Sequence, residues 1–173
     1  MYYFTTYPSP VGLITLACDG NSLAGLWLEG QKYHGQPLPG AMAEKADLPI
    51  FNAAKQWLDK YFAGGRPDIP ALPLAPIGSA FRQSVWEILC GIPYGQVITY
   101  GEIAKRLAVK SGQAVGGAVG RNPISIVIPC HRVVGANGSL TGYAGGMQTK
   151  IRLLELEGVD VSKLFVPKKG TAL

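Results

Sequence analysis

The chain has 173 residues, of which 47% are hydrophobic and 16% are charged. These values exclude a disordered chain or a coiled coil, and they suit one packed domain or two small ones. The net charge of +5 is uneven, because residues 1–76 hold five basic and six acidic side chains, whereas residues 77–173 hold eleven and five. The second half therefore suits a polyanionic partner, although a basic solvated surface has the same composition.

The first thirty residues predict an antiparallel meander of three short strands. β-Branched and aromatic residues gather in three runs, and the turn sequences Pro8-Ser9-Pro10 and Asp19-Gly20-Asn21 separate the runs. The strands are expected at residues 2–6, 12–18 and 22–28.

A helix and a proline-rich connection complete the first part of the chain. After a polar stretch from Glu29 to Lys45, apolar residues recur at helical spacing from Ile50 to Phe62. Four prolines between Arg66 and Pro76 then exclude a continuing helix. Together with the change in charge balance, they predict an N-terminal α/β domain over residues 1–76 and a second domain over residues 77–173.

Three capped helices are expected next. Ser79 can cap the first, Thr99 and Glu102 form a capping box that opens the second, and Ser111 can cap the third. They should end near Gly91, Ala108 and Asn122. The last two are joined by about three residues, which predicts a helix-turn-helix in a mostly helical, winged-helix-like domain.

The third of these helices is rich in glycine. Gly116, Gly117 and Gly120 each cost roughly 1 kcal/mol relative to alanine in a helix interior. Close packing against another helix would explain them. A surface free of side chains, able to approach a nucleic-acid backbone or groove, would explain them equally well.

A candidate nucleophile follows this helix. The β-branched run Ile124 to Ile128 predicts a short buried strand that leads into Pro129-Cys130-His131-Arg132, and a final amphipathic helix is expected from Met147 to Glu157. Cys130 suits a reactive thiol, because a histidine, an arginine and glycine-rich loops lie beside it, but most free cysteines are core residues. His131 needs an orienting partner, for which Glu157 is a candidate.

Other sequence features limit the chemistry and the compartment. The three cysteines form no CxxC pair and are odd in number, which favours a reduced, cytoplasmic setting. His34 and His131 are the only histidines, so no metal is expected, and without a GxGxxG or Walker pattern no nucleotide cofactor is expected. No stretch approaches the roughly 20 apolar residues of a membrane span.

The sequence Ile128-Pro129-Cys130-His131-Arg132-Val133, with Asn122-Pro123 before it and Thr141 to Gly146 after it, resembles the 6-O-alkylguanine-DNA alkyltransferases, in particular the bacterial Ogt type. The resemblance implies DNA repair in a single turnover, with double-stranded DNA as partner and a monomeric protein without cofactor. Cys130 would take the alkyl group of an O6-alkylguanine, and O4-alkylthymine would be a further substrate. His131 and a water would draw off the thiol proton, and Glu157 would orient His131.

The same resemblance implies the remaining site residues. Tyr100 would donate to guanine N3, and the backbone of Ala144 would reach the oxygen. The carbonyl groups of Cys130 and Val133 would accept from the exocyclic amine, and Asn122 would tie the recognition helix to the active-site turn. The expected substrate-binding residues are Asn122, Val133, Tyr143, Ala144 and Lys150. The expected DNA-binding residues are Lys110, Gln113, Ala114, Gly117 and Arg121.

Two departures from the family pattern stand out. Gln113 occupies the position of an arginine that in many members fills the gap left by the flipped base, and the zinc ligands of some N-terminal domains are missing. The main alternative function is a non-catalytic, lesion-sensing DNA-binding protein; a thiol hydrolase or redox enzyme is a third.

Overall fold

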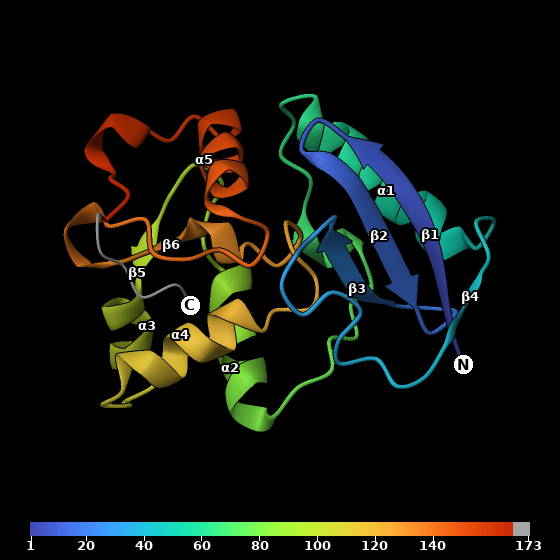
Figure 1. Cartoon of the computed structure of the whole chain (residues 1–173), viewed down its shortest axis with the longest axis horizontal. Helices are drawn as coiled ribbons and strands as arrows, with labels where there is room; N and C mark the ends of the chain where they lie inside the picture. The colour runs from blue at the N-terminus through green and yellow to red at the C-terminus, as the bar shows by residue number, and fades with distance from the viewer. Residues whose placement is uncertain (168–173) are drawn as a thin grey trace. The chain divides into compact units, whose positions relative to one another are not determined.

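Figure 1 shows the computed structural model of the chain, which describes residues 1–167. Its contacts divide the chain into two compact units. Unit 1 contains Met1–Ile77 and Pro123–Val127, and unit 2 contains Gly78–Asn122 with the described residues from Ile128 onward. The expected fold class, a small α/β part followed by a mostly helical part, is confirmed.

A four-stranded sheet forms the frame of unit 1. β1 (Tyr2–Ser9), β2 (Gly12–Cys18) and β3 (Leu23–Leu28) form the predicted antiparallel meander. β4 (Met42–Glu44) runs parallel to β1, which gives the order β3-β2-β1-β4. This edge strand lies in the stretch expected to be polar and irregular. Its three residues, of which only Met42 is partly buried, are too few to show a strand pattern.

Helix α1 (Pro49–Phe62) packs against β1, β2 and β3 and supplies much of the core of unit 1. Its buried residues are Ile50, Phe51, Ala54, Trp57, Leu58 and Tyr61. β3 is buried along its whole length, and Gly25 within it leaves space for Trp27, since a Cβ there would lie 2.1 Å from the indole ring. A 3-10 turn, η1 (Ile69–Ala71), follows in the proline-rich segment. Within residues 1–167 no helix is long and apolar enough to cross a membrane.

Among the described residues, unit 2 contains four helices, and capping residues in the sequence predicted where the first three begin. They are α2 (Ala80–Cys90), α3 (Tyr100–Arg106), α4 (Gly112–Gly120) and α5 (Met147–Leu156). The Ser79 hydroxyl caps α2, the capping box of Thr99 and Glu102 opens α3, and the Ser111 hydroxyl accepts from the N–H of Ala114 at 3.2 Å. These expectations are therefore confirmed.

Helices α3 and α4 form the predicted helix-turn-helix. They pack on each other, and α4 also packs on α2, where the indole N–H of Trp86 donates to the Ala118 carbonyl at 2.9 Å. A two-residue parallel pair, β5 (Ile98–Thr99) with β6 (Val133–Val134), lies in the same unit. Three 3-10 turns complete it: η2 (Cys130–Arg132), η3 (Ala136–Gly138) and η4 (Val161–Lys163).

The strand predicted at residues 124–128 is wrong. The run is buried, as its composition indicated, but Ile126 has a φ of +72° and the N–H of Val127 donates to the carbonyl of Ser125 at 2.8 Å. The backbone therefore turns tightly inside the run. A β-branched residue is a poor candidate for positive φ, so the sequence carried no signal for this turn.

The same run also differs from the expected domain division. Leu26 of β3 donates its N–H to Pro123 at 2.9 Å and accepts from the N–H of Ser125 at 3.0 Å. These bonds hold residues 123–127 in unit 1, whereas a single boundary after residue 76 assigns them to the second domain.

Candidate functional site

Cys130 lies at the start of a tight turn rather than in an extended segment. Its backbone N–H donates to the Ile128 carbonyl at 2.8 Å, and η2 follows directly after Pro129. The residue is 5% exposed. Since Cys130 and His131 belong to one 3-10 turn, their side chains do not alternate between two faces as they would in a strand.

Three predicted substrate-binding residues surround the Cys130 thiol. Burial raises the pKa of this thiol. The Asn122 side chain, the Lys150 ammonium group and the Tyr143 hydroxyl all favour the thiolate and lower the pKa, but their effect is smaller than that of burial. In the resting protein the thiol is therefore protonated. It is also surrounded by groups that stabilise its charged form, as a nucleophile requires.

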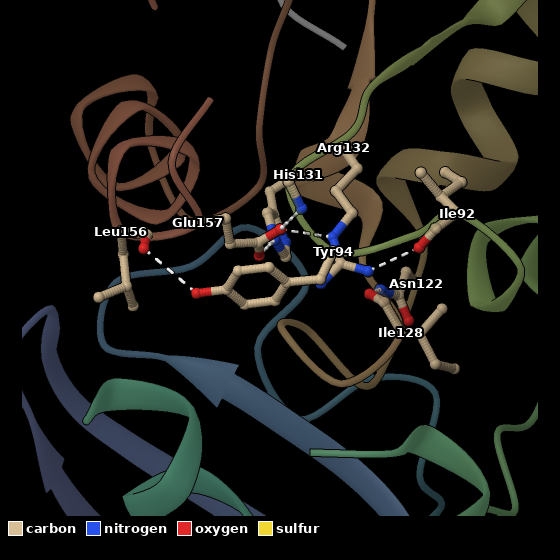
Figure 2. A network of polar contacts seen from close by, with 9 residues as sticks. Ile92, Tyr94, Asn122, Ile128, His131, Arg132, Leu156 and Glu157 are labelled. Carbon is tan, nitrogen blue, oxygen red and sulfur yellow. Dashed lines mark hydrogen bonds and ion pairs between the residues drawn. The ribbon is translucent and has the colours of Figure 1, made fainter. Parts of the chain in front are cut away.

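His131 and Glu157 form a buried pair. The Nε2 atom of His131 lies 2.5 Å from Oε2 of Glu157, and both side chains are fully buried (Figure 2). The other ring nitrogen, Nδ1, is buried and has no hydrogen-bond partner among the described residues. The structure thus brings together the histidine and the acid that the sequence suggested, and it leaves one ring nitrogen of His131 unused.

The Glu157 carboxylate accepts from two further donors. Nε of Arg132 donates to Oε1 at 2.7 Å (Figure 2). The backbone N–H of Gly95 donates to the same oxygen at 3.3 Å. Burial works to raise the pKa of Glu157, but the hydrogen bonds and charges of His131 and Arg132 outweigh it and lower the pKa to about 2. Glu157 is therefore ionised at neutral pH.

Arg132 is held on the side away from Glu157 by the loop after α2. Its Nη1 donates to the Ile92 carbonyl at 2.7 Å, and its guanidinium carbon lies 5.7 Å from the centre of the Tyr94 ring. The Tyr94 hydroxyl in turn donates to the Leu156 carbonyl at 3.2 Å. The sequence placed Arg132 beside Cys130 but gave no partner for it, although an arginine in an apolar run requires a buried acceptor.

Asn122 and Lys150 fix the backbone around the thiol. The Asn122 amide donates to the Ile128 carbonyl at 2.8 Å, and Nζ of Lys150 donates to the carbonyls of Val133 at 2.7 Å and Thr141 at 3.0 Å. Lys150 is fully buried, and burial lowers its pKa to about 8 although Cys130 acts in the opposite direction. A buried cation is thus held close to the candidate nucleophile.

Tyr100 provides a buried hydroxyl near the same thiol. Burial raises the pKa of Tyr100, the neighbouring Thr141 hydroxyl lowers it, and Cys130 raises it. The Tyr100 and Thr141 hydroxyls lie near each other, but their geometry falls outside a hydrogen bond, and neither has another partner within residues 1–167. Thr141 was not singled out from the sequence. Ala144 lies in the adjoining loop and is partly exposed.

The predicted DNA-binding residues share one property. All of them are exposed: Lys110, Gln113, Ala114, Gly117 and Arg121. A Cβ added at Gly117 or Gly120 would meet no atom within 4 Å, whereas Gly116 is buried. Internal packing therefore does not require Gly117 or Gly120.

The two remaining cysteines lie in different surroundings. Cys18 is buried in β2 of unit 1, and Cys90 is partly buried at the end of α2; both are free thiols whose pKa is raised by burial. Within the described chain, no three His, Cys, Asp or Glu side chains come together in a group that could hold a metal ion. The arrangement around Cys130 suits nucleophilic transfer to sulfur.

Comparisons with known proteins agree with this chemistry. The family model for the ribonuclease-like domain of 6-O-methylguanine DNA methyltransferase matches residues 2–76, and the model for the DNA-binding domain of that family matches residues 80–159. Methylated-DNA–protein-cysteine methyltransferases from Haemophilus influenzae and Methanosarcina acetivorans are 42% and 45% identical over 158 residues. The alignments cover 91% and 90% of this chain and 87% and 98% of the relatives. The structure of Mycobacterium tuberculosis OGT in complex with DNA matches with a TM-score of 0.80 at 40% identity, over 94% of each chain.

Proposed function

The chain belongs to the 6-O-methylguanine DNA methyltransferase family, and from this premise we propose that Cys130 is the thiol that accepts the alkyl group. The protein binds DNA and repairs it by alkyl transfer, with the activity of a methylated-DNA–protein-cysteine methyltransferase. We assign O6-alkylguanine as its substrate, with O4-alkylthymine as a second one. The position of Cys130 among Asn122, Tyr143 and Lys150 is the observation that carries this proposal.

The reaction is a displacement at the alkyl carbon. The thiol proton passes through a water to Nδ1 of His131, which is buried and has no hydrogen bond in the described structure. The Cys130 sulfur then bonds to the alkyl carbon, the bond from that carbon to O6 breaks, and its electron pair stays on the guanine. The proton that His131 took from the thiol returns through water to the guanine, which leaves neutral. Glu157 holds the ring of His131 from the opposite side. The thioether has no route back to a thiol, so each molecule reacts once.

The flipped base is held by groups beside the thiol. Tyr100, whose buried hydroxyl has no hydrogen bond among residues 1–167, donates to guanine N3 as negative charge develops, and the Ala144 N–H reaches the oxygen. The carbonyls of Cys130 and Val133 accept from the exocyclic amine. Lys150 supports this role, because its bond to the Val133 carbonyl fixes the direction of that group.

DNA is bound through helix α4. The open surface at Gly117 allows a close approach to the minor groove, and Gln113 and Ala114 lie near the start of the same helix. Lys110 and Arg121 contact phosphates, and the damaged nucleotide turns out of the stack to reach Cys130. These contacts are largely independent of base sequence, as repair at scattered lesions requires.

The remaining organisation follows the family. We propose that residues 1–76 and 77–173 act as N-terminal and catalytic domains of a monomer, and that the protein works in the cytoplasm, where thiols stay reduced. The alternative of a non-catalytic, lesion-sensing protein is not favoured, since the relatives are methyltransferases.

A duplex with a single O6-methylguanine tests the proposal. Intact-protein and peptide mass spectrometry should find one methyl group on Cys130, with a yield that stops at one per molecule. Cys130→Ala should lose transfer and keep DNA binding, while Cys18→Ala, the matched control in β2, should react normally. Methylation of Cys18 or Cys90 instead, or repeated turnover, would show the proposal to be wrong.

A further inference from the structure

The Glu157 carboxylate lies between two side chains that can each supply its counter-charge. Oε2 faces His131 at 2.5 Å, and Oε1 accepts from Nε of Arg132 at 2.7 Å and from the Gly95 N–H. Figure 2 shows dashed lines from the Glu157 carboxylate to both His131 and Arg132. Which of the two cations neutralises Glu157 decides whether His131 can act as a base.

Arg132 is the partner with the fixed charge. A guanidinium group stays protonated in proteins, whereas an imidazole near neutral pH can lose its proton. Arg132 is also anchored independently of His131, through the Ile92 carbonyl at 2.7 Å and the face of the Tyr94 ring. The negative charge of Glu157 is therefore already matched when His131 is neutral.

The other groups around His131 disfavour a second cation. The turn η2 packs on α5 and α2. Lys150 lies in α5, and Glu157 follows this helix directly. On α2, Cys90 is a thiol whose pKa is raised by burial. With Arg132 and Lys150 both charged, protonation of the fully buried His131 would add an uncompensated charge to the protein interior.

We propose that Arg132 is a positioning residue that takes up the charge of Glu157, so that His131 rests as a neutral imidazole protonated on Nε2 and keeps Nδ1 as the base for Cys130. The buried Nδ1 atom, which has no hydrogen bond in residues 1–167, agrees with this tautomer. Burial, aided by Arg132 and Lys150, lowers the pKa of His131 despite the opposing effect of Glu157. The inference rests on the proposed role of Cys130.

Nitrogen NMR of histidine-labelled protein tests the resting state directly. The chain has two histidines, and the exposed His34 can be replaced by glutamine to assign the signals. At pH 7 the wild-type protein should show His131 protonated on Nε2 alone. An imidazolium signal in the wild-type protein would overturn the proposal, whatever the variants do.

Two kinds of substitution separate charge from geometry. Arg132→Gln, and Arg132→Met if the first variant does not fold, should convert His131 to the imidazolium at pH 7, whereas Arg132→Lys should leave it neutral. The alkyl-transfer rate should fall on the acid side of its pH profile. The midpoint of this fall should lie about one pH unit higher in the uncharged variants than in the wild-type protein, and should be unchanged in Arg132→Lys. A neutral His131 in a folded, uncharged variant would contradict the inference.

The two readouts fail independently. If Cys130 takes no methyl group but the protonation of His131 still follows the charge at position 132, the proposed function is wrong and the assignment of Arg132 stands. If methyl transfer to Cys130 occurs but the protonation state of His131 does not depend on the charge at position 132, only the assignment of Arg132 is wrong.

Discussion

Asn122, the residue after the C-cap of α4, donates its side-chain amide to the carbonyl of Ile128 at 2.8 Å. The backbone just before Pro129 and Cys130 is therefore fixed by the helix proposed to contact DNA. Asn122 is 3% exposed, and its side chain favours the Cys130 thiolate. A movement of the end of α4 should therefore displace the backbone before Cys130.

Asn122→Ala removes this bond and leaves the Ile128 carbonyl without the Asn122 donor. We predict a loss of about 1–3 kcal/mol in the free energy of unfolding and slower methyl transfer at pH 7, because the thiolate loses a donor. Urea denaturation and single-turnover kinetics measure the two effects. Asn52→Ala, on the exposed face of α1, serves as the control, because it should neither lower the free energy of unfolding nor slow methyl transfer. Unchanged kinetics in Asn122→Ala would rule out a role in the reaction.

Lys150→Met should raise the pKa of the Cys130 thiol, because it removes a buried cation that favours the thiolate. The rate of iodoacetamide labelling at Cys130, followed against pH, should shift to higher pH. The difference from wild type should narrow above about pH 8, where Lys150 itself loses its proton. The exposed Lys163 provides the control Lys163→Met. An identical labelling profile in Lys150→Met would show that the ammonium group does not influence the thiol.

The Glu157 cluster should make the protein sensitive to acid. The folded-state pKa of Glu157 is lowered from 4.5 to about 2, so its stabilising contribution is complete above pH 4.5 and is lost as the pH falls toward 2. The lowered pKa of His131 acts in the same direction below about pH 6.5, since the unfolded chain then binds a proton that the folded protein excludes. Urea midpoints measured from pH 7 to pH 3 should fall with pH. The slope between pH 4.5 and 3 should be smaller in Glu157→Gln, and an equal slope would contradict this account.

Features set by neighbouring residues were predictable from the sequence. The caps at Ser79, Thr99 and Ser111 occur where expected, because a cap needs only a side chain and the next three residues. The β1–β3 meander was predictable for the same reason, since its turns and alternation are local.

Features that depend on distant partners were not predictable. The positive φ of Ile126 contradicts its local preference and exists because hydrogen bonds to Leu26 hold the backbone on either side. The pairing of Arg132 with Glu157 joins residues 25 positions apart. His131 and Glu157 were paired as a hypothesis only because a catalytic histidine needs an acid, and the Gly95 loop that completes the cluster gave no such signal.

Gly117→Ala should separate stability from DNA binding. A methyl group at this exposed helical position meets no atom within 4 Å, so the substitution should stabilise the protein by about 0.5–1 kcal/mol. If α4 lies close against DNA, the same methyl group should weaken binding about three- to tenfold, a cost of roughly 1 kcal/mol. Asn52→Ala should also stabilise its helix but leave the affinity unchanged. If Gly117→Ala binds DNA with the affinity of the wild-type protein, the DNA does not lie against α4 at this position.

Gln113→Arg tests how the damaged base is held out of the stack. Gln113 is exposed at the second position of α4, where its amide can hydrogen-bond to an unpaired base but brings no charge. An arginine there should strengthen DNA binding, steepen the slope of log affinity against log salt by about 1, and speed methyl transfer if extrusion limits the rate. Gln56→Arg, on the exposed surface of α1, adds the same charge and should produce none of these changes. If both variants bind DNA more tightly by the same factor, the gain in affinity comes from net charge, and residue 113 does not contact the lesion. If only Gln113→Arg gains, the neutral side chain of the natural protein sets a lower affinity, and extrusion then depends on the exposed cations Lys110 and Arg121.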